Sequence, residues 1–214
     1  MHLKRNKTPK SWPIKRKGTK YVARSMYNLK KSIPLLIIIR DILNLIKTRR
    51  ELKKILNLKK IKINGKVVRE EKYPLMLFDN LCLDNRNFRV IIKNKKFALA
   101  EIGEKESNEK IVKVIGKKLL KRGRMQINLS DGRNYISKEK IKTQDSVVIN
   151  LKENKIAEIL PFKEGCRVLL ISGKRIGAEA EVISLKDKVI IKIGDEKINA
   201  DQKSLMVINL GNLR

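Results

Sequence analysis

The first forty residues of the chain are strongly basic and contain no acidic residue. Residues 1–40 carry twelve Lys or Arg, and the first carboxylate in the sequence is Asp41. A segment with this charge repels itself, so it is not expected to bury an apolar core on its own. We expect it to become ordered against a dense array of negative charge, of which nucleic-acid backbone is the most common.

Aromatic residues and chain breakers refine this expectation. Trp12 and Tyr21 stand among the basic residues and offer flat faces that can stack on bases. A transit peptide would be amphipathic and rich in Ser and Arg, whereas this segment is rich in Lys and is interrupted by Pro9, Pro13 and Gly18. The pattern favours nucleic-acid binding over a targeting peptide, and a solvated basic tail is the remaining alternative.

The basic character extends along the whole chain. Lys and Arg number 52 against 22 Asp and Glu, which gives a formal net charge of +30 over 214 residues. A freely soluble enzyme gains little from such self-repulsion, and a polyanionic partner would relieve it. The apolar content of 42% excludes a wholly disordered chain. The length suggests about one to three small domains.

Few residues are suited to catalysis or metal binding. His2 is the only histidine, Cys82 and Cys166 are the only cysteines, and no CxxC, Walker A or Gly-x-Gly-x-x-Gly pattern occurs. We therefore predict no enzyme activity, no cofactor and no metal site. We expect both cysteines to be small buried residues without a disulfide, as in a cytoplasmic protein. The apolar run Ile33–Ile39 is shorter than the roughly 20 residues of a spanning helix, so no membrane segment and no signal peptide are expected.

Two helices are expected after the basic segment. Ser32 is a plausible N-cap, with Pro34 in the first turn, for a largely apolar and therefore buried helix that reaches about Lys47. Thr48 and Glu51 have the spacing of a capping box, which predicts the start of a second helix.

Short strands are predicted for the remainder of the chain. Asn64-Gly65 between alternating residues predicts a β-hairpin, because type I′ turns need a positive φ at both positions. From about Leu77, turn signals separate short apolar runs, which favours a small antiparallel barrel or sandwich over βαβ units. The strands are expected at 89–92, 97–99, 111–115, 125–129, 147–151 and 156–160, and then at 168–171, 182–183, 189–191 and 206–208.

A basic edge of the second helix, beside the hairpin, forms a second candidate contact with RNA. A helix face and an adjacent hairpin could grip the phosphates of a folded RNA from two directions. The alternative is a charged solvent face, which is ordinary for an amphipathic helix. The residues concerned are Arg49, Arg50, Lys53 and Lys54 on the helix, and Lys62, Asn64 and Lys66 on the hairpin.

Several stretches then make the sequence recognisable. They are His2–Arg5 with Pro9–Ile14, Ser32–Leu36, Tyr73-Pro74 with Asp79, and Gln126–Asn134. In this order they resemble the S4e family of ribosomal proteins of the archaeal and eukaryotic small subunit. Residues 40–67 are similar to an S4-type RNA-binding domain and residues 162–185 to a KOW motif, and the resemblance extends from His2 to Gly211.

The resemblance implies an α+β fold in four parts. A basic rRNA-binding extension (1–31) is followed by a small S4-like α+β RNA-binding domain (32–76). A central antiparallel β domain (77–161) and a C-terminal SH3-like KOW β-barrel (162–214) complete the expected arrangement.

The resemblance also implies a function. The chain would be a structural constituent of the small ribosomal subunit, without catalytic activity, that binds the rRNA, with its 5′ domain as the docking site. It would stabilise the rRNA fold during assembly and translation. The implied partners are the rRNA and neighbouring small-subunit proteins, with no membrane, no small-molecule substrate and no homo-oligomer, on cytoplasmic ribosomes.

Candidate RNA contacts come from the motifs and from the charge pattern. Match to the family motifs points to Lys4, Arg5, Lys10, Trp12, Arg40, Arg49, Arg50, Asn64 and Arg133. The charge pattern adds Lys7, Lys15, Arg16, Lys17, Lys53, Lys54 and Lys66. Tyr21 and Tyr27 are further candidates for stacking. Arg133 follows Asp131-Gly132, which is equally well explained as a plain hairpin turn.

The chain departs from the family pattern at three places. Ser25–Asn28 replaces a Gly-Pro-His segment, and Asn57 is expected to supply the left-handed residue after the second helix, where the family has Gly. In the KOW-like segment Ala180 replaces a Gly and is flanked by Glu179 and Glu181. Two carboxylates there favour a structural or protein-contacting KOW element over close approach to phosphate.

Two other function classes remain for comparison. An RNA-modifying enzyme with an S4 module would need a separate catalytic domain, and the segment after Leu77 offers neither its length nor a catalytic acid motif. A KOW-bearing transcription elongation factor would need a polymerase-binding domain and would not be expected to carry the acid-free basic segment.

Overall fold

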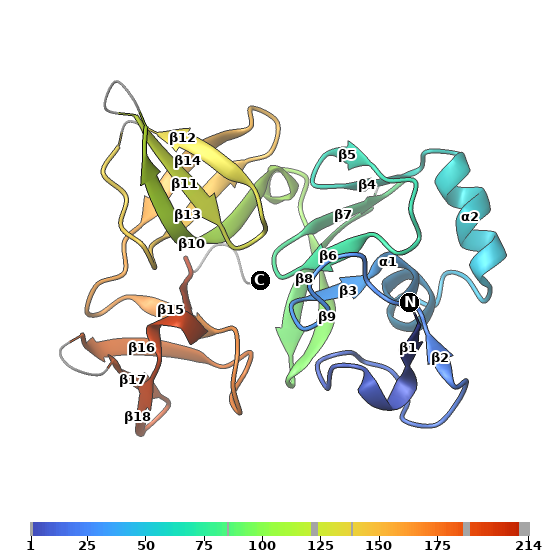
Figure 1. The fold of residues 1–214 in the computed structure, drawn as a ribbon, viewed down its shortest axis with the longest axis horizontal. Coiled ribbons are helices and arrows are strands. Elements are labelled where there is room, and N and C mark those ends of the chain that lie inside the picture. The colour runs from blue at the N-terminus through green and yellow to red at the C-terminus, as the bar shows by residue number, and fades with distance from the viewer. Residues whose placement is uncertain (1, 85, 121–123, 138, 186–188, 210–214) are drawn as a thin grey trace. The chain divides into compact units, whose positions relative to one another are not determined.

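The chain is built mostly from short strands, with few helices (Figure 1). The computed structural model describes residues 2–84, 86–120, 124–137, 139–185 and 189–209. All strand pairs found within those residues are antiparallel, as predicted. The chain divides into two compact units, Met1–Asn108 and Glu109–Arg214, which we term the N-terminal and C-terminal units.

A five-stranded sheet in the order β5-β4-β7-β8-β9 is the framework of the N-terminal unit, with two smaller ribbons, β1–β2 and β3–β6. The bounds are β1 Leu3–Lys4, β2 Tyr21–Val22, β3 Ser32–Pro34, β4 Ile61–Ile63, β5 Lys66–Val67, β6 Pro74–Met76, β7 Asn80–Leu83, β8 Arg86–Lys93 and β9 Lys96–Ile102. Because β4 pairs with β7, this sheet joins residues on both sides of the boundary expected between residues 76 and 77.

The first helix begins later than the sequence predicts. Ser32 lies in strand β3. Helix α1 (Leu35–Ile37) starts after Pro34 and continues into the π-helical segment η2 (Ile38–Ile42). The Ser32 hydroxyl is buried and lies 2.9 Å from the carbonyl oxygen of Asn28, to which it donates. The prediction of Ser32 as an N-cap is therefore wrong, whereas burial of the helix is confirmed.

The second helix, α2 (Arg49–Asn57), begins at the predicted capping box. The Glu51 N–H donates to Thr48 Oγ1 at 3.3 Å, and the Thr48 N–H donates to Glu51 Oε2 at 3.4 Å. The Lys47 N–H donates to the same carboxylate at 2.9 Å, and this bond and those from Thr48 lower the pKa of Glu51. Lys59, with φ of 57°, is the left-handed residue after the helix, so the expectation for Asn57 is wrong.

The predicted turns are confirmed where the backbone needs a left-handed residue. Asn64 and Gly65, between β4 and β5, have φ of 49° and 76°, as a type I′ turn requires. In Asp131-Gly132 and Glu153-Asn154 the second residue has φ of 86° and 55°. Local sequence therefore sets these reversals.

The basic segment contributes to the core of the N-terminal unit. Leu3 and Trp12 are buried in the same hydrophobic cluster as the α1 residues, and Ile14 and Val22 pack against it. The Trp12 indole Nε1–H donates to the carbonyl oxygen of Ser32 at 3.0 Å. The expectation that this segment buries no core is wrong, because its scattered apolar residues add to a core that the rest of the unit supplies.

The C-terminal unit contains two five-stranded sheets, in the orders β12-β11-β10-β13-β14 and β18-β17-β16-β15-β19. The bounds are β10 Glu109–Leu119, β11 Met125–Leu129, β12 Asn134–Ser137, β13 Ser146–Asn150, β14 Lys155–Leu160, β15 Arg167–Leu170, β16 Glu179–Ser184, β17 Val189–Ile193, β18 Glu196–Ala200 and β19 Leu205–Val207. The predicted strand positions in this unit are confirmed, and β12 and β18 were not predicted.

The strands of residues 77–161 do not share one sheet. Strands β7 to β9 belong to the N-terminal unit and β10 to β14 to the C-terminal unit, whereas we expected one central domain. Residues 103–108 contain the short turn η3 (Glu106–Asn108), and β10 begins at the next residue. Residues 210–214, at the end of the expected KOW domain, lie outside the described residues.

A buried lysine connects the two sheets of the C-terminal unit. The Lys113 ammonium, on β10, donates to the carbonyl oxygens of Gln202, Lys203 and Leu205 at 2.6, 3.3 and 2.5 Å. These acceptors lie in the turn η5 (Gln202–Ser204) and at the start of β19. An ammonium group is tolerated in a protein interior only with such partners, so these bonds fix the two sheets together.

Candidate nucleic-acid interface

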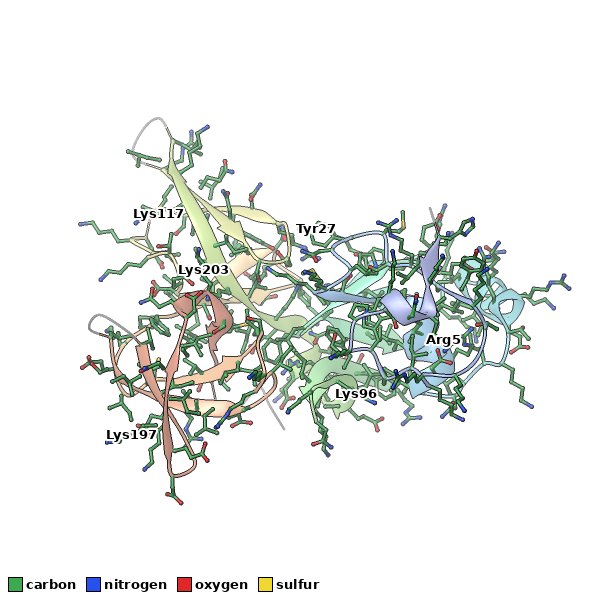
Figure 2. The ribbon with its side chains drawn as sticks, turned by 60° about the horizontal axis from the view of Figure 1, so that its bottom comes forward. Arg5, Tyr27, Lys96, Lys117, Lys197 and Lys203 are labelled. Atoms are coloured by element: carbon green, nitrogen blue, oxygen red, sulfur yellow. The ribbon has the colours of Figure 1, made fainter. Side chains whose placement is uncertain are left out.

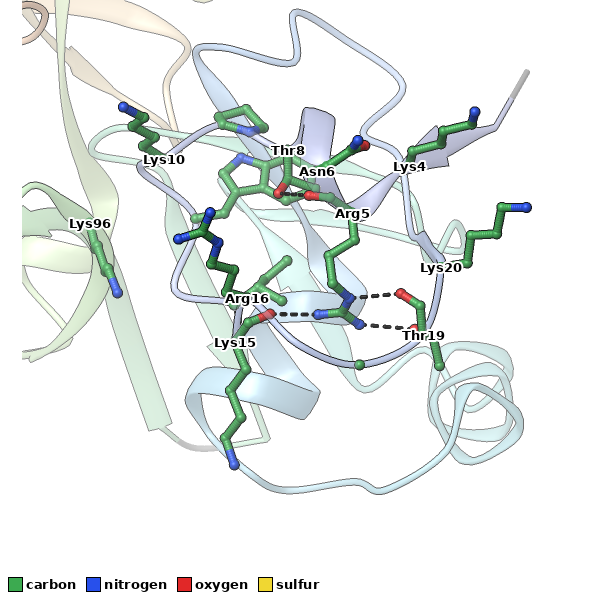
Figure 3. A pocket seen from close by; sticks show the side chains of 14 residues that line it. Lys4, Arg5, Asn6, Thr8, Lys10, Lys15, Arg16, Thr19, Lys20 and Lys96 are labelled. Atoms are coloured by element: carbon green, nitrogen blue, oxygen red, sulfur yellow. Dashed lines mark hydrogen bonds between the residues drawn. The ribbon is translucent and has the colours of Figure 1, made fainter.

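The N-terminal unit contains a hollow of about 870 Å³ lined by basic side chains, which we term the basic hollow (Figure 3). Half of the described residues that line it are Lys or Arg, and none is Asp or Glu. Its seven cations are Lys4, Arg5, Lys10, Lys15, Arg16, Lys20 and Lys96. Charges of one sign around a concave surface focus the field and attract a polyanion.

Strand β9 contributes to this hollow because the basic segment is tied to it. The Phe97 N–H donates to the carbonyl oxygen of Ser11 at 2.8 Å, which brings Lys96 beside the segment. In Figure 3 the side chains of Lys10 and Lys96 lie on the side of the hollow opposite to those of Lys4 and Lys20. The cations therefore surround the hollow instead of forming a single row.

Arg5 holds the loop of residues 15–19 in position. Its Nε, Nη1 and Nη2 groups donate to the Thr19 carbonyl oxygen, the Lys15 carbonyl oxygen and Thr19 Oγ1 at 2.7, 2.8 and 2.9 Å (Figure 3). Gly18, at φ of +141°, packs so closely that a Cβ there would lie 2.9 Å from Arg5 Nη2. Arg5 is predicted to contact RNA, but its Nε, Nη1 and Nη2 groups all donate to this loop.

Trp12 does not offer a stacking face. Its side chain is 3% exposed, and its indole N–H is satisfied by the Ser32 carbonyl oxygen. The prediction that Trp12 stacks on RNA is wrong, because the ring is part of the hydrophobic core beneath the basic hollow.

The exposed aromatic residues lie elsewhere on the same unit. The rings of His2 and Tyr21 are 5.4 Å apart between centroids and inclined by 49°, and the Lys20 ammonium lies 5.6 Å from the centre of the Tyr21 ring. Tyr21 and Tyr27 are 49% and 48% exposed. Of the two, Tyr21 pairs with Lys4, which lines the hollow, and it retains a surface on which a base could stack.

The basic face of α2 is exposed, although one of its residues is paired. Arg49 forms an ion pair with Glu71, whose carboxylate is buried, and Arg49 Nε donates to Glu71 Oε2 at 2.5 Å. Arg50, Lys53 and Lys54 are exposed. Strand β4, the first strand of the hairpin, begins at Ile61, four residues after α2 ends (Figure 1).

Two predicted contact residues make internal hydrogen bonds. Asn64 is 5% exposed, its Nδ2 donates to Asp79 Oδ1 at 2.7 Å, and its Oδ1 accepts from the Asn80 N–H at 3.0 Å. Because the Asn64 side chain is buried, the prediction that this side chain contacts RNA is wrong. Arg40 donates from Nε and Nη2 to the Asp41 carboxylate, each at 2.9 Å, and that pairing offsets much of its charge.

The Asp131-Gly132 turn in the C-terminal unit rests on a buried ion pair. Lys110 Nζ donates to Asp131 Oδ2 at 2.7 Å, and both side chains are almost fully buried. Burial alone would raise the pKa of Asp131, but Lys110, with a hydrogen bond from the Arg133 N–H, lowers it overall. Arg133 Nε is 3.8 Å from the same carboxylate, and its side chain is 28% exposed.

The other predicted contacts are exposed on the surface (Figure 2 draws the side chains of both units). They are Lys4, Lys7, Lys10, Lys15, Arg16, Lys17 and Lys66. Lys20 and Lys96 line the hollow but were not predicted. Lys20 lies within the basic run, and Lys96 follows Lys93 and Lys95, so local charge density could have indicated both.

Comparison with known proteins agrees with this arrangement. A family model described as Ribosomal family S4e matches residues 84–156. The small ribosomal subunit protein eS4 of Methanosphaera stadtmanae is 37% identical to this chain over 191 residues, which cover 86% of this chain and 79% of that protein. The chain belongs to the S4e family. The family predicted from the sequence motifs is therefore confirmed.

A second relative covers more of the chain, and a solved S4e structure has the same fold. The small ribosomal subunit protein eS4 of Staphylothermus marinus is 32% identical over 97% of this chain and 90% of that protein. The crystal structure of the 30S ribosomal protein S4e from Thermoplasma acidophilum matches with a TM-score of 0.73 and 25% identity, over 83% of this chain and 95% of that chain. The mostly β S4e fold is thus common to both structures.

In this S4e-family chain the KOW-like segment keeps two left-handed glycines. Gly173 and Gly177 have φ of 98° and 84°. Ala180 is buried in β16, whereas its neighbours Glu179 and Glu181 are exposed. The exposed carboxylates give this strand a surface that differs in charge from the basic hollow.

The residues that the structure describes contain no group of three or more His, Cys, Asp or Glu side chains placed to hold a metal ion. No described helix is long and apolar enough to cross a membrane. Cys82 and Cys166 are free thiols and are half-buried, which is less than the full burial expected; burial raises the pKa of Cys166.

Proposed function

We propose that this S4e-family chain is a structural component of the small ribosomal subunit that binds rRNA. The basic hollow carries the proposal, because seven cations surround it and no acidic residue lines it among those described. Phosphate groups are the natural counter-charges for such a surface, and neutralising them releases counterions. The printed names of the relatives, small ribosomal subunit protein eS4, support the same assignment.

The residues would act in three groups. Exposed cations of the basic segment and hollow would contact phosphates, with Arg5 holding their loop in place. The exposed face of α2 and the hairpin residue Lys66 would form a second contact. Arg133, presented by the turn that Lys110 and Asp131 anchor, would form a third contact from the C-terminal unit. Such phosphate contacts fix position and orientation, so the recognition is of RNA shape.

Finer features of the proposal follow from the resemblance to the family. The docking site would be the 5′ domain of the small-subunit rRNA, and the protein would stabilise the rRNA fold during assembly and translation on cytoplasmic ribosomes. It would act without catalysis or cofactor and would contact neighbouring ribosomal proteins rather than a second copy of itself. Residues 1–31 would be the rRNA-binding extension, 32–76 the S4-like module and 162–214 a KOW barrel.

The sheet formed by β15 to β19 is the proposed KOW barrel. The exposed carboxylates of Glu179 and Glu181 on β16 repel phosphate at short range, so this strand would face protein rather than RNA. In the Arg133 turn, on the other sheet of the unit, the Asp131 carboxylate is buried and paired with Lys110, so this turn is the proposed RNA contact of the unit.

Co-sedimentation tests the proposal directly. A tagged full-length chain, produced in its native cells, is expected to migrate with the small subunit through a sucrose gradient in moderate salt. Recovery of the chain in the top fractions, or with RNA polymerase, would contradict the proposal. Nuclease treatment of the small-subunit fraction should release the chain, which distinguishes attachment to rRNA from attachment to proteins alone.

A further inference from the structure

The β1–β2 ribbon separates apolar from polar and aromatic residues on its two faces. Leu3 pairs with Val22, and Lys4 with Tyr21. Because cross-strand partners share a face and successive residues alternate, Leu3 and Val22 face the core while His2, Lys4 and Tyr21 share the outer face. The burial agrees, since Leu3 is 7% exposed and Tyr21 is 49% exposed.

The outer face of this ribbon adjoins the basic hollow. Lys4, the cross-strand partner of Tyr21, lines the hollow, and so does Lys20, which precedes Tyr21 in the chain. The Arg5 N–H donates to the Lys20 carbonyl oxygen at 3.0 Å, which fixes that end of the ribbon. One aromatic surface therefore stands at the rim of a cationic hollow, with a lysine on each side of it.

We infer that the ribbon and the hollow together bind an unpaired RNA nucleotide. Its base stacks on the exposed face of Tyr21, beside His2, and its phosphate is held by Lys4 and Lys20 at the rim of the hollow. This inference rests on the proposed function, because it specifies which form of RNA the site takes.

The chemistry of the two parts favours unpaired RNA over other polyanions. In a duplex both faces of each base are covered by its neighbours, whereas bases in loops and bulges can stack on aromatic side chains. An anionic membrane would engage the lysines but offers no ring to pair with Tyr21. An acidic protein segment would likewise leave the aromatic surface without a function.

The chain offers a matched control for the stacking residue. Tyr27 lies on the same unit and is 48% exposed, against 49% for Tyr21, but it lies outside the β1–β2 ribbon, in which Tyr21 pairs with the hollow-lining Lys4. Substituting Tyr27 therefore removes an equally exposed aromatic ring without altering the ribbon. The variant Tyr21→Phe keeps the ring face and loses only the hydroxyl.

The test measures binding of the full-length chain to two RNA probes of equal length. One is a single strand with 2-aminopurine near its centre, and the other is a blunt-ended duplex, which has no loop. Tyr21→Ala is expected to weaken binding of the single strand about 5- to 150-fold, since stacking on one aromatic side chain is worth about that factor. Tyr21→Phe and Tyr27→Ala should stay within about twofold of the parent chain.

Two further readouts identify the parts of the site. Quenching of the 2-aminopurine on binding should be lost in Tyr21→Ala and retained in Tyr21→Phe. The double variant Lys4→Gln/Lys20→Gln should reduce the slope of log K against log salt by about 1.4, which is two phosphate contacts on a single strand. Binding of the duplex should be insensitive to Tyr21→Ala.

The outcomes separate the inference from the proposed function. If the parent chain binds RNA with a steep salt dependence but Tyr21→Ala binds the single strand as tightly as Tyr27→Ala does, the inference is wrong and the proposed function stands. If the parent chain binds neither probe, the proposed function itself fails. Circular dichroism of each variant identifies any that does not fold, and for that case Tyr21→Leu, which keeps an apolar side chain, replaces Tyr21→Ala.

Discussion

The charge of the basic hollow should determine how RNA binding depends on salt. The informative variant replaces Lys10, Lys15 and Arg16 by Gln, because their side chains line the hollow and are exposed. The loop should keep its shape, since Arg5 bonds to the backbone carbonyl of residue 15 and not to its side chain. The substitutions thus remove charge without removing the contacts that position the loop.

The size of the effect follows from counterion release. Each phosphate contact contributes about 0.7 to the slope of log K against log salt for a single strand, so three lost contacts reduce the slope by about 2. If the two lines meet near 1 M salt, the affinities should differ about 100-fold at roughly 0.1 M salt. Fluorescence anisotropy with labelled RNA, over a series of salt concentrations, measures both quantities.

A control with the same loss of charge distinguishes the hollow from a general electrostatic effect. Lys152, Lys163 and Lys197 are exposed residues of the C-terminal unit that lie outside the hollow, and all three can be replaced by Gln. That variant should keep a slope within about 0.5 of the parent chain's. Equal slopes for the two triple variants would refute the assignment of phosphate contacts to the hollow.

Three further predictions concern stability. Trp12→Ala should lower the free energy of unfolding by about 3–5 kcal/mol, as large-to-small changes in a core do, and thermal unfolding followed by circular dichroism would show it. Thr48→Ala should cost about 1 kcal/mol through loss of the α2 cap, whereas Thr48→Ser should retain the stability in the same assay. Lys110→Met should cost about 3 kcal/mol at neutral pH, because it leaves the buried Asp131 carboxylate without its main partner. In the parent chain the lowered pKa of Asp131 contributes stability above pH of about 4, and this stability is lost as the pH falls through the folded-state pKa. The loss of stability in Lys110→Met, measured by urea unfolding, should therefore become smaller in acid. A loss that does not depend on pH would exclude Asp131 as its cause.

The features that could be predicted are those set by neighbouring residues. The capping box of α2 and the Asn64-Gly65 turn depend on three or four adjacent positions, and both formed as expected. Strand positions were predictable for the same reason, since alternation and turn residues lie within each segment. The S4e motifs added the family, which composition alone does not define.

The features that could not be predicted depend on distant contacts. Trp12 is surrounded by cations in the sequence, and its burial depends on the Ser32 carbonyl oxygen twenty positions away and on the core of the whole unit. Lys96 joins the hollow through a hydrogen bond between Phe97 and Ser11. An Asn side chain is suited to hydrogen-bond RNA, but the Asn64 amide donates to Asp79 within the protein. The charge pattern thus predicted a basic surface, but not which of its residues are buried or paired within the protein.

The carbonyl oxygens that accept hydrogen bonds from Lys113 also determine when the C-terminal unit can complete its packing during synthesis. They lie 89 to 92 residues further along the sequence. At about 5–20 residues per second, β10 is synthesised roughly 5 to 18 seconds before residue 205 exists. During that interval these three hydrogen bonds cannot form, so the Lys113 ammonium has to stay hydrated although it lies on the central strand of its sheet. The two sheets of the C-terminal unit therefore reach their final packing late, and a nascent chain stalled before residue 202 should be more open to proteolysis than the finished protein.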